Sequence, residues 1–260
     1  MGEVLLLTLV AFACPTDPGC PPYYTAASIA NTAASVVGLY APDSFVTIYG
    51  LNLADATTSL TGNALEVHLP GAGVTVLVGG LLADLWYASP SQINMLIPNQ
   101  LGAGPAILQI EVNGVAGPPI QIMIGSVAPA MWQTDASTVL AAHLNGQVVS
   151  SDSPAQPGEL VVLYATGLGP TLPAAEPNQA PAAAAIVATP GFEVWLNGAA
   201  VDPSKVPYAG VTPGYAGLYQ VNLRLPDDAP PNPEVRIGFA GQMSPAQLFM
   251  PLQSIVPSHL

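Results

Sequence analysis

One seven-residue phrase occurs twice in the chain, and this repeat limits the folds that the chain can adopt. Residues 92–98 and 220–226 both read Gln-apolar-Asn-apolar-x-apolar-Pro. In the second copy apolar and polar residues alternate, which is the pattern of a half-buried antiparallel strand. A proline closes each copy, because it has no N–H for a β-ladder. The repeat predicts two related units built from strands.

Other segments recur in the same order in the two halves. Residues 44–49 correspond to 159–164, residues 74–80 correspond to 192–198, and the Tyr-Ala before the first phrase returns as Tyr208-Ala209. With 25 glycines and 29 prolines, and no sustained 3.6-residue apolar period, the chain favours many short strands over helices. We predict an all-β protein with two tandem β-sandwich domains. The expected divisions are 1–22 (apolar segment and linker), 23–126 and 127–260.

Several turns and loops are expected from composition. Asn113-Gly114 follows an alternating segment and predicts a hairpin turn. The second half carries an insertion at residues 213–217 before its copy of the phrase. Residues 180–188 are rich in alanine, and we expect them to form an exposed loop.

The charge of the chain excludes two classes of partner. The chain has 16 acidic residues and a net charge of −13, and its basic residues are Lys205, Arg224 and Arg236. Three basic residues cannot neutralise the negative charges of nucleic-acid phosphates or of anionic lipid headgroups. We therefore expect no binding to nucleic acid or to anionic membranes.

The apolar run at residues 4–13 is too short to span a bilayer as a helix. Three interpretations stay open. It is a signal-peptide core that ends at Ala11-Phe12-Ala13, a retained strand that pairs with a neighbouring subunit, or a lead-in to a lipid-modified Cys14. The preceding Met-Gly-Glu lacks the positive charge that a signal peptide normally carries. As a donor strand, the run would present Val4, Leu6, Thr8, Val10 and Phe12 on one face.

The two cysteines, Cys14 and Cys20, bracket a turn-rich spacer. They can close a small disulfide loop in an oxidising compartment, or remain reduced. Two cysteines and three scattered histidines offer no zinc-ligand spacing.

No motif in the chain predicts catalysis. There is no Gly-x-Ser-x-Gly and no His-Glu-x-x-His. We expect His68 at a strand end and His143 beside a turn, and Asp227-Asp228 lacks EF-hand spacing. The sequence therefore predicts no catalytic residue, cofactor or metal site, and no enzymatic activity.

Aromatic residues cluster around the two organising strands. A sugar-stacking platform would use exposed rings beside amide donors, whereas core filling explains the same rings without a ligand. The candidate platform residues are Trp86, Tyr87, Tyr208, Tyr215 and Tyr219. The repeated amides Gln92, Asn94, Gln220 and Asn222 are interpreted as scaffold that ties loops to strand edges.

Longer segments carry a family resemblance. Residues 157–170 and 208–222, with 45–53 and 87–98 in the first half, resemble the signature of an uncharacterised secreted family paralogous in Acidobacteria. That family is similar to the immunoglobulin-like IPT/TIG domains. The resemblance covers nearly everything from about Ala26 onward. It implies two tandem immunoglobulin-like β-sandwich domains, export to the cell surface or the extracellular space, and no assigned catalytic residues.

Together these observations predict a non-enzymatic extracellular structural protein, a subunit or decoration of a cell-surface or filamentous assembly. Self-association through open strand edges is the expected mechanism. The alternative is a glycan-binding or adhesion module that uses the aromatic residues named above.

Overall fold

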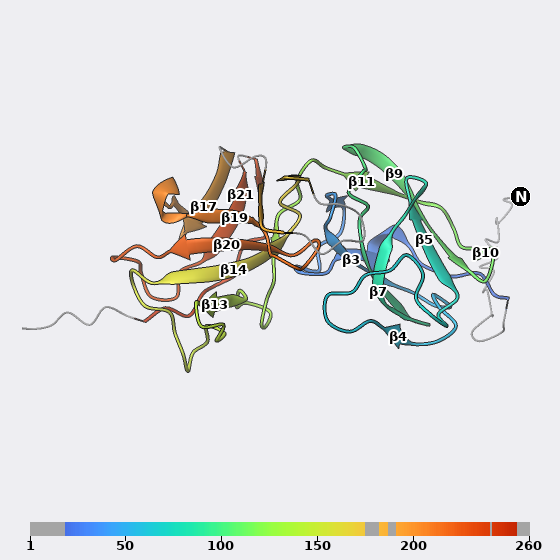
Figure 1. Cartoon of the computed structure of the whole chain (residues 1–260), viewed down its shortest axis with the longest axis horizontal. Helices are drawn as coiled ribbons and strands as arrows, with labels where there is room; N and C mark the ends of the chain where they lie inside the picture. The colour runs from blue at the N-terminus through green and yellow to red at the C-terminus, as the bar shows by residue number, and fades with distance from the viewer. Residues whose placement is uncertain (1–18, 175–181, 187–190, 240, 254–260) are drawn as a thin grey trace, which may run out of the picture.

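The computed structural model describes residues 19–174, 182–186, 191–239 and 241–253, and their strands gather into two bodies that lie side by side (Figure 1). We call the described residues up to 126 the first unit and those from 127 the second unit. The predicted all-β class is confirmed, since the described residues contain no α-helix. Their short 3-10 turns include Ala26–Ser28 and Pro203–Lys205.

Two sheets form the first unit. One has the strand order β1-β3-β8-β7-β4, and the other has the order β2-β11-β9-β5-β6 with β10 on β9. The chain enters both sheets, because β1 pairs antiparallel with β3 and β2 pairs parallel with β11. The first two strands therefore lie in different sheets of the unit. The bounds are β1 Ile29–Asn31, β2 Leu39–Tyr40, β3 Phe45–Tyr49, β4 Thr58–Ser59, β5 Val74–Val78, β6 Leu81–Leu82, β7 Asp84–Ser89, β8 Gln92–Leu96, β9 Gly104–Val112, β10 Val115–Ala116 and β11 Ile120–Ile124.

The second unit repeats this plan. Its larger sheet has the order β12-β14-β20-β19-β16-β15 with β13 on β14, and its smaller sheet has the order β18-β17-β21-β22. No strand of the described ranges pairs across the two units. The bounds are β12 Ala130–Met131, β13 Ala141–His143, β14 Leu160–Thr166, β15 Thr171–Leu172, β16 Ala184–Ile186, β17 Phe192–Leu196, β18 Ala199–Ala200, β19 Tyr208–Val211, β20 Tyr219–Arg224, β21 Val235–Phe239 and β22 Gln242–Met243.

The repeated phrase forms the central strand of one sheet in each unit. The glutamine of the phrase lies opposite a tyrosine of a neighbouring strand in both copies. Gln92 of β8 lies opposite Tyr49 of β3, and Gln220 of β20 lies opposite Tyr164 of β14. The expected correspondence of the two halves is therefore confirmed residue by residue at this strand. The Asn113-Gly114 turn is also confirmed, with positive φ at both residues (48° and 81°), as a type I′ hairpin requires.

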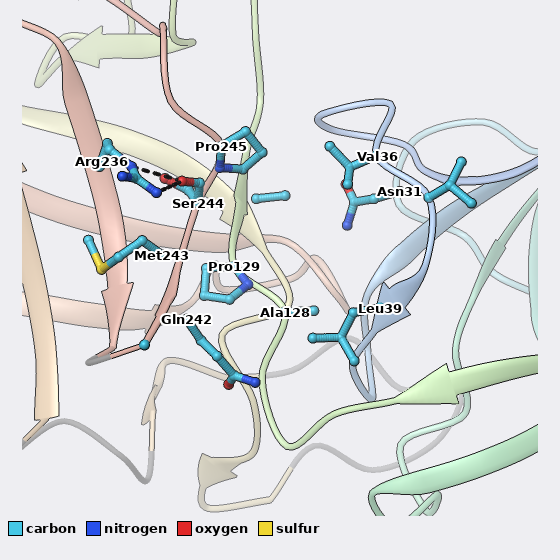
Figure 2. A pocket seen from close by; sticks show the side chains of 13 residues that line it. Asn31, Val36, Leu39, Ala128, Pro129, Arg236, Gln242, Met243, Ser244 and Pro245 are labelled. Carbon is cyan, nitrogen blue, oxygen red and sulfur yellow. Dashed lines mark hydrogen bonds between the residues drawn. The ribbon is translucent and has the colours of Figure 1, made fainter.

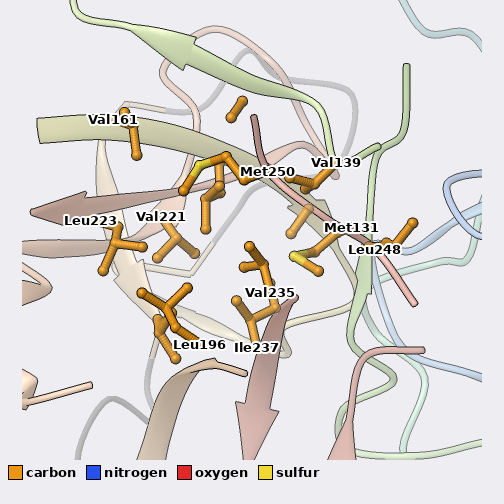
Figure 3. Close-up of a cluster of buried hydrophobic side chains, with 14 of the residues drawn as sticks. Met131, Val139, Val161, Leu196, Val221, Leu223, Val235, Ile237, Leu248 and Met250 are labelled. Carbon is orange, nitrogen blue, oxygen red and sulfur yellow. The ribbon is translucent and has the colours of Figure 1, made fainter. Parts of the chain in front are cut away.

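Each unit encloses its own apolar core between its two sheets. Alternate residues of the strands face inward and are fully buried, such as Val46, Ile48 and Ile93 in the first unit. Each such side chain contributes about 1.5–3 kcal/mol of transfer free energy. Figure 3 shows the second core, whose labelled members are Met131, Val139, Val161, Leu196, Val221, Leu223, Val235, Ile237, Leu248 and Met250. Two cores accord with two domains, although the domain boundaries stay a prediction.

The structure differs from expectation in two places. The alanine-rich stretch was expected to be a loop, but part of it forms strand β16. In this strand Ala184 and Ile186 are buried and Ala185 between them is exposed. The outermost strands of the four sheets are only two or three residues long. Short edges offer few free backbone groups to a partner strand, so the edges of the described sheets give little support to assembly by strand addition alone. The donor-strand residues 4–13 lie outside the described residues.

Candidate functional site

Two of the five predicted platform residues, Tyr219 and Tyr208, use their hydroxyl groups within the second unit. Tyr219 is only 1 % exposed, and its hydroxyl donates to the Gly169 carbonyl at 2.6 Å. Burial, and then the nearby Asp43 carboxyl, raise the pKa of this hydroxyl. Tyr208 is half-buried in the second unit and donates to the Val211 carbonyl at 2.7 Å. For Tyr219 the platform interpretation is wrong, because its ring fills the core.

Trp86 and Tyr215 meet where the two units touch. They line a cavity of about 120 Å³ together with Phe45 and Asn63. Trp86 reaches this place because it is the extra residue of a β-bulge in β7, between the pairs Leu85–Met95 and Tyr87–Asn94. Its ring packs edge-on against Phe45, with centroids 4.8 Å apart. Tyr215, in the inserted turn of the second unit, is 46 % exposed.

A row of exposed side chains on the first unit was missed by the sequence interpretation. Tyr23, Leu51 and Tyr49 are 58 %, 56 % and 52 % exposed. Tyr23 pairs antiparallel with Leu51 through two backbone hydrogen bonds of 2.9 Å. Cross-strand partners share a sheet face, and residues two apart on one strand do so too. The three side chains therefore form one continuous patch on the outer face.

Two amides continue this patch across the sheet. Gln92 lies beside Tyr49, and its Nε2 donates to Asn94 Oδ1 at 2.8 Å. Asn94 lies beside Tyr87, the remaining member of the predicted platform. The amides thus bond to each other on a central strand, which corrects the expectation that they tie loops to edges. We call Tyr23, Tyr49, Leu51, Gln92 and Asn94 the tyrosine–amide face.

The tyrosine–amide face is uncharged and elongated. Phe45, Thr47 and Tyr49 alternate along β3 on this side, and Phe45 ends at the cavity with Trp86 and Tyr215. From residue 45 to residue 51 an antiparallel strand extends about 20 Å. Aromatic rings therefore stand at both ends of this side, with the amide groups and the buried Thr47 between them.

The second unit has the same amide pair but not the same face. Gln220 Nε2 donates to Asn222 Oδ1 at 3.1 Å, beside Tyr164 and Tyr208. The position that matches Leu51 is Thr166, which is buried at the contact between the units. Its hydroxyl donates to the Gly217 carbonyl at 3.0 Å and accepts from the Phe45 N–H at 3.1 Å. The contact between units therefore covers the position of Thr166, whereas the matching Leu51 is exposed.

His143, Ser153 and Glu159 are arranged like a hydrolytic triad. His143 Nδ1 lies 2.6 Å from Glu159 Oε1, and its Nε2 lies 3.3 Å from Ser153 Oγ. However, Nε2 also lies 3.1 Å from the Ser153 carbonyl oxygen, which only an N–H can satisfy. The hydrogen bond to Glu159 raises the pKa of His143 and favours the imidazolium. An imidazolium that donates from both nitrogens has no lone pair to accept the serine proton.

We expect Ser153 to be unreactive toward a fluorophosphonate probe. A labelling experiment on the full chain at pH 7, read by intact mass, should show no adduct. Labelling at Ser153 that disappears in His143→Ala would contradict this expectation and assign the cluster to catalysis. The Ser150→Ala variant serves as the control for a neighbouring hydroxyl.

The remaining candidates add no second site. His68 Nδ1 lies 3.3 Å from Thr75 Oγ1, next to the strand β5. Cys20 is buried and disulfide-bonded, while Cys14 lies outside the described residues. Within the described ranges no group of three or more His, Cys, Asp or Glu side chains is placed to hold a metal ion. Nor does any helix in those ranges have the length and apolarity to cross a membrane.

No protein-family model and no curated protein sequence matches the chain, so the resemblance to the secreted family stays a prediction. Among solved structures, the chain is similar to a surface glycan-binding protein from Prevotella bryantii (12 % identity, TM-score 0.29, 89 % of this chain and 42 % of that one). It is also similar to a Bacteroides ovatus protein of a mixed-linkage glucan utilization locus, solved with a heptasaccharide (11 %, 0.35, 83 % and 44 %). A third is the extracellular region of plexin A4 (10 %, 0.26, 92 % and 16 %). This chain spans less than half of each, and such distant likenesses carry no argument about its ligand.

Proposed function

We propose that the protein is an extracellular or cell-surface glycan-binding module whose tyrosine–amide face holds a neutral, extended sugar chain. The observation that carries this proposal is the exposed row of Tyr23, Leu51 and Tyr49 beside the Gln92–Asn94 pair. Exposed contiguous apolar surface on a monomer marks interaction sites. Tyrosine presents an apolar ring and a polar hydroxyl, which suits a ligand with apolar C–H faces and hydroxyl edges.

Neutral glycans are preferred over acidic ones because of charge. The face itself carries no ionisable group that is charged at neutral pH, and the whole chain has a net charge of −13. An anionic polysaccharide would therefore meet repulsion without a local cation to offset it. The other expected function, a non-enzymatic structural subunit, requires self-association. A surface other than the tyrosine–amide face would have to supply it.

The proposal is tested with a glycan array of neutral and acidic polysaccharides, followed by affinity measurements on the best ligand. Each ring that stacks on a sugar is assigned about 1 kcal/mol, so Tyr49→Ala should weaken binding about 5-fold. The Tyr23→Ala/Tyr49→Ala double variant should weaken it about 25-fold or more. Tyr215→Ala tests whether the ligand extends to the junction of the units.

Tyr164→Ala is the matched control. It removes a tyrosine at the equivalent position of the second unit, where buried Thr166 replaces exposed Leu51. It should leave the affinity unchanged. Absence of binding to every glycan, or equal affinities of the double variant and the unmodified protein, would refute the proposed function.

A further inference from the structure

A groove of about 550 Å³ lies between the two units (Figure 2). Val36, Val37 and Leu39 of the first unit form one wall, and all three are exposed to solvent. Arg236 and Met243 of the second unit belong to the other wall. The groove therefore presents an aliphatic surface on one side and a cation on the other.

The groove offers hydrogen-bond donors and no acidic group. Arg236 donates from Nε and Nη2 to the Ser244 carbonyl at 3.0 and 2.8 Å, and its Nη1 has no acceptor among the described residues. Asn31 is 3 % exposed, and its Oδ1 accepts from the Ala33 N–H at 2.9 Å. Its Nδ2 points into the space between the walls (Figure 2). A ligand that carries a carboxylate would satisfy these donors.

The rest of the lining favours a peptide over a sugar. The walls are aliphatic, without an aromatic ring on which a sugar could stack. Two edge strands border the groove, since β2 pairs only with β11 and β22 pairs only with β21. A peptide in extended conformation can hydrogen-bond to such edges while its side chains fill the groove. Both edges are short, so the side-chain contacts must supply most of the affinity.

We propose that the groove binds residues 3–8 of a second copy of this chain, Glu-Val-Leu-Leu-Leu-Thr, as an extended strand. Alternation along a strand lets Glu3 face Arg236 while Val4 and Leu6 face the aliphatic wall. The acidic residue and the aliphatic run that follows it match the cation and the aliphatic wall of the groove.

Geometry favours a second copy over the chain's own segment. The described chain begins beside Leu51, at the end of β3 that lies away from the second unit, whereas Phe45 at the other end touches Trp132 of that unit. Cys20 is disulfide-bonded and Cys14 is the other cysteine of the chain, so a bond between them would hold residue 14 within about 6 Å of Cys20. Six extended residues from 14 to 8 span at most about 21 Å, against the ~20 Å from residue 51 to residue 45, so the chain's own segment would have to run straight and fully extended to reach the groove. If two copies exchange their segments reciprocally, a dimer forms, and if each copy donates its segment to the next, a chain of subunits forms.

The experiment measures binding of a labelled synthetic peptide of residues 2–13 to protein that lacks residues 2–13, by fluorescence anisotropy. Arg236→Gln should weaken binding about 10-fold or more, and a peptide with Glu3→Gln should lose a similar factor. Val37→Asp, at an exposed position, should also weaken binding about 10-fold, and it guards against misfolding of the arginine variant. The full-length chain should form oligomers with rising concentration in light scattering, and the truncated protein should remain monomeric.

Arg224→Gln is the control, because it removes the other arginine of the second unit, an exposed residue on β20. It should change nothing, and Tyr49→Ala should leave assembly intact, so the test is independent of glycan binding. A mature chain that begins at Cys14 or later, by intact mass, would overturn the proposal. So would peptide binding that is indifferent to Arg236→Gln, or a full-length chain that stays monomeric.

Discussion

Gly217→Ala is expected to lower the free energy of unfolding by about 2–5 kcal/mol. Gly217 has a φ of +72°, which costs an L-residue about 1–2 kcal/mol. An added Cβ would also lie 2.4 Å from Leu96 Cδ2 and 2.8 Å from the Asp43 carbonyl, both in the first unit. Overpacking of this kind typically costs about 1–3 kcal/mol. Urea unfolding followed by tryptophan fluorescence measures the loss, because Trp86 and Trp132 both pack against Phe45 beside this contact.

Gly214→Ala separates strain from packing in the same turn. Gly214 has a similar φ of +85°, but an added Cβ would meet only Asn63 Nδ2, at 3.6 Å. This variant should lose only the conformational term of about 1–2 kcal/mol. Equal losses for the two variants would show that the turn is not packed tightly against the first unit.

The second large effect is a pH dependence that comes from Asp43. Burial, and then the negative charge of Asp84, raise the pKa of the Asp43 carboxyl to about 7. Burial also raises the pKa of Asp84, and Tyr219 of the second unit faces Asp43. An acid whose folded pKa exceeds its unfolded value binds protons more tightly in the folded state. The contribution of Asp43 to the free energy of unfolding is therefore greatest below about pH 4. It falls as the pH rises through about 7 and is constant above that.

Asp43→Asn should remove most of this dependence. Above pH 7 the variant should be more stable than the unmodified protein by about 2 kcal/mol, and below pH 4 the two should agree. Three pKa units correspond to at most about 4 kcal/mol, and residual access of water lowers that limit. Urea unfolding at pH 4, 6 and 8 measures the difference. Asp84→Asn should shift the midpoint of the dependence to lower pH.

Asp228→Asn is the control for the loss of one negative charge, since Asp228 is exposed on the second unit. It should leave the pH profile unchanged. If Asp43→Asn destabilises the protein equally at every pH, the carboxylate has a structural partner and the assigned cause is wrong.

Much of the fold could be predicted because its signals are local. Strict alternation in residues 219–225 decides which side chains face the core, and Asn113-Gly114 decides a turn by its own dihedral preferences. The repeat then predicts that β8 and β20 occupy equivalent places, and the pairs Gln92–Tyr49 and Gln220–Tyr164 confirm it. The alanine-rich strand β16 was missed, because small residues give a weak apolar signal and its pairing with β19 is distant in sequence.

The candidate site was predicted only in part, and for a physical reason. A list of aromatic residues does not tell a buried ring from an exposed one, so Tyr219 was included and Tyr49 was not. Exposure of Tyr49 follows from its place at the end of β3, and that of Tyr23 from its pairing with Leu51. The meeting of Trp86 with Tyr215 depends on a bulge and on the contact between units.

The sequence by itself determined the strand class, the internal repeat, the acidic charge and the unusual Glu3 before an apolar run. Each of these is a property of neighbouring residues or of composition. Only the tertiary structure decided which of two equivalent sheet faces stays open and where a groove forms. Thr166 is covered because it bonds to Phe45 of the first unit, and the groove forms where residues 36–39 face residues 242–245. Packing between segments more than 100 residues apart leaves no local pattern in the chain.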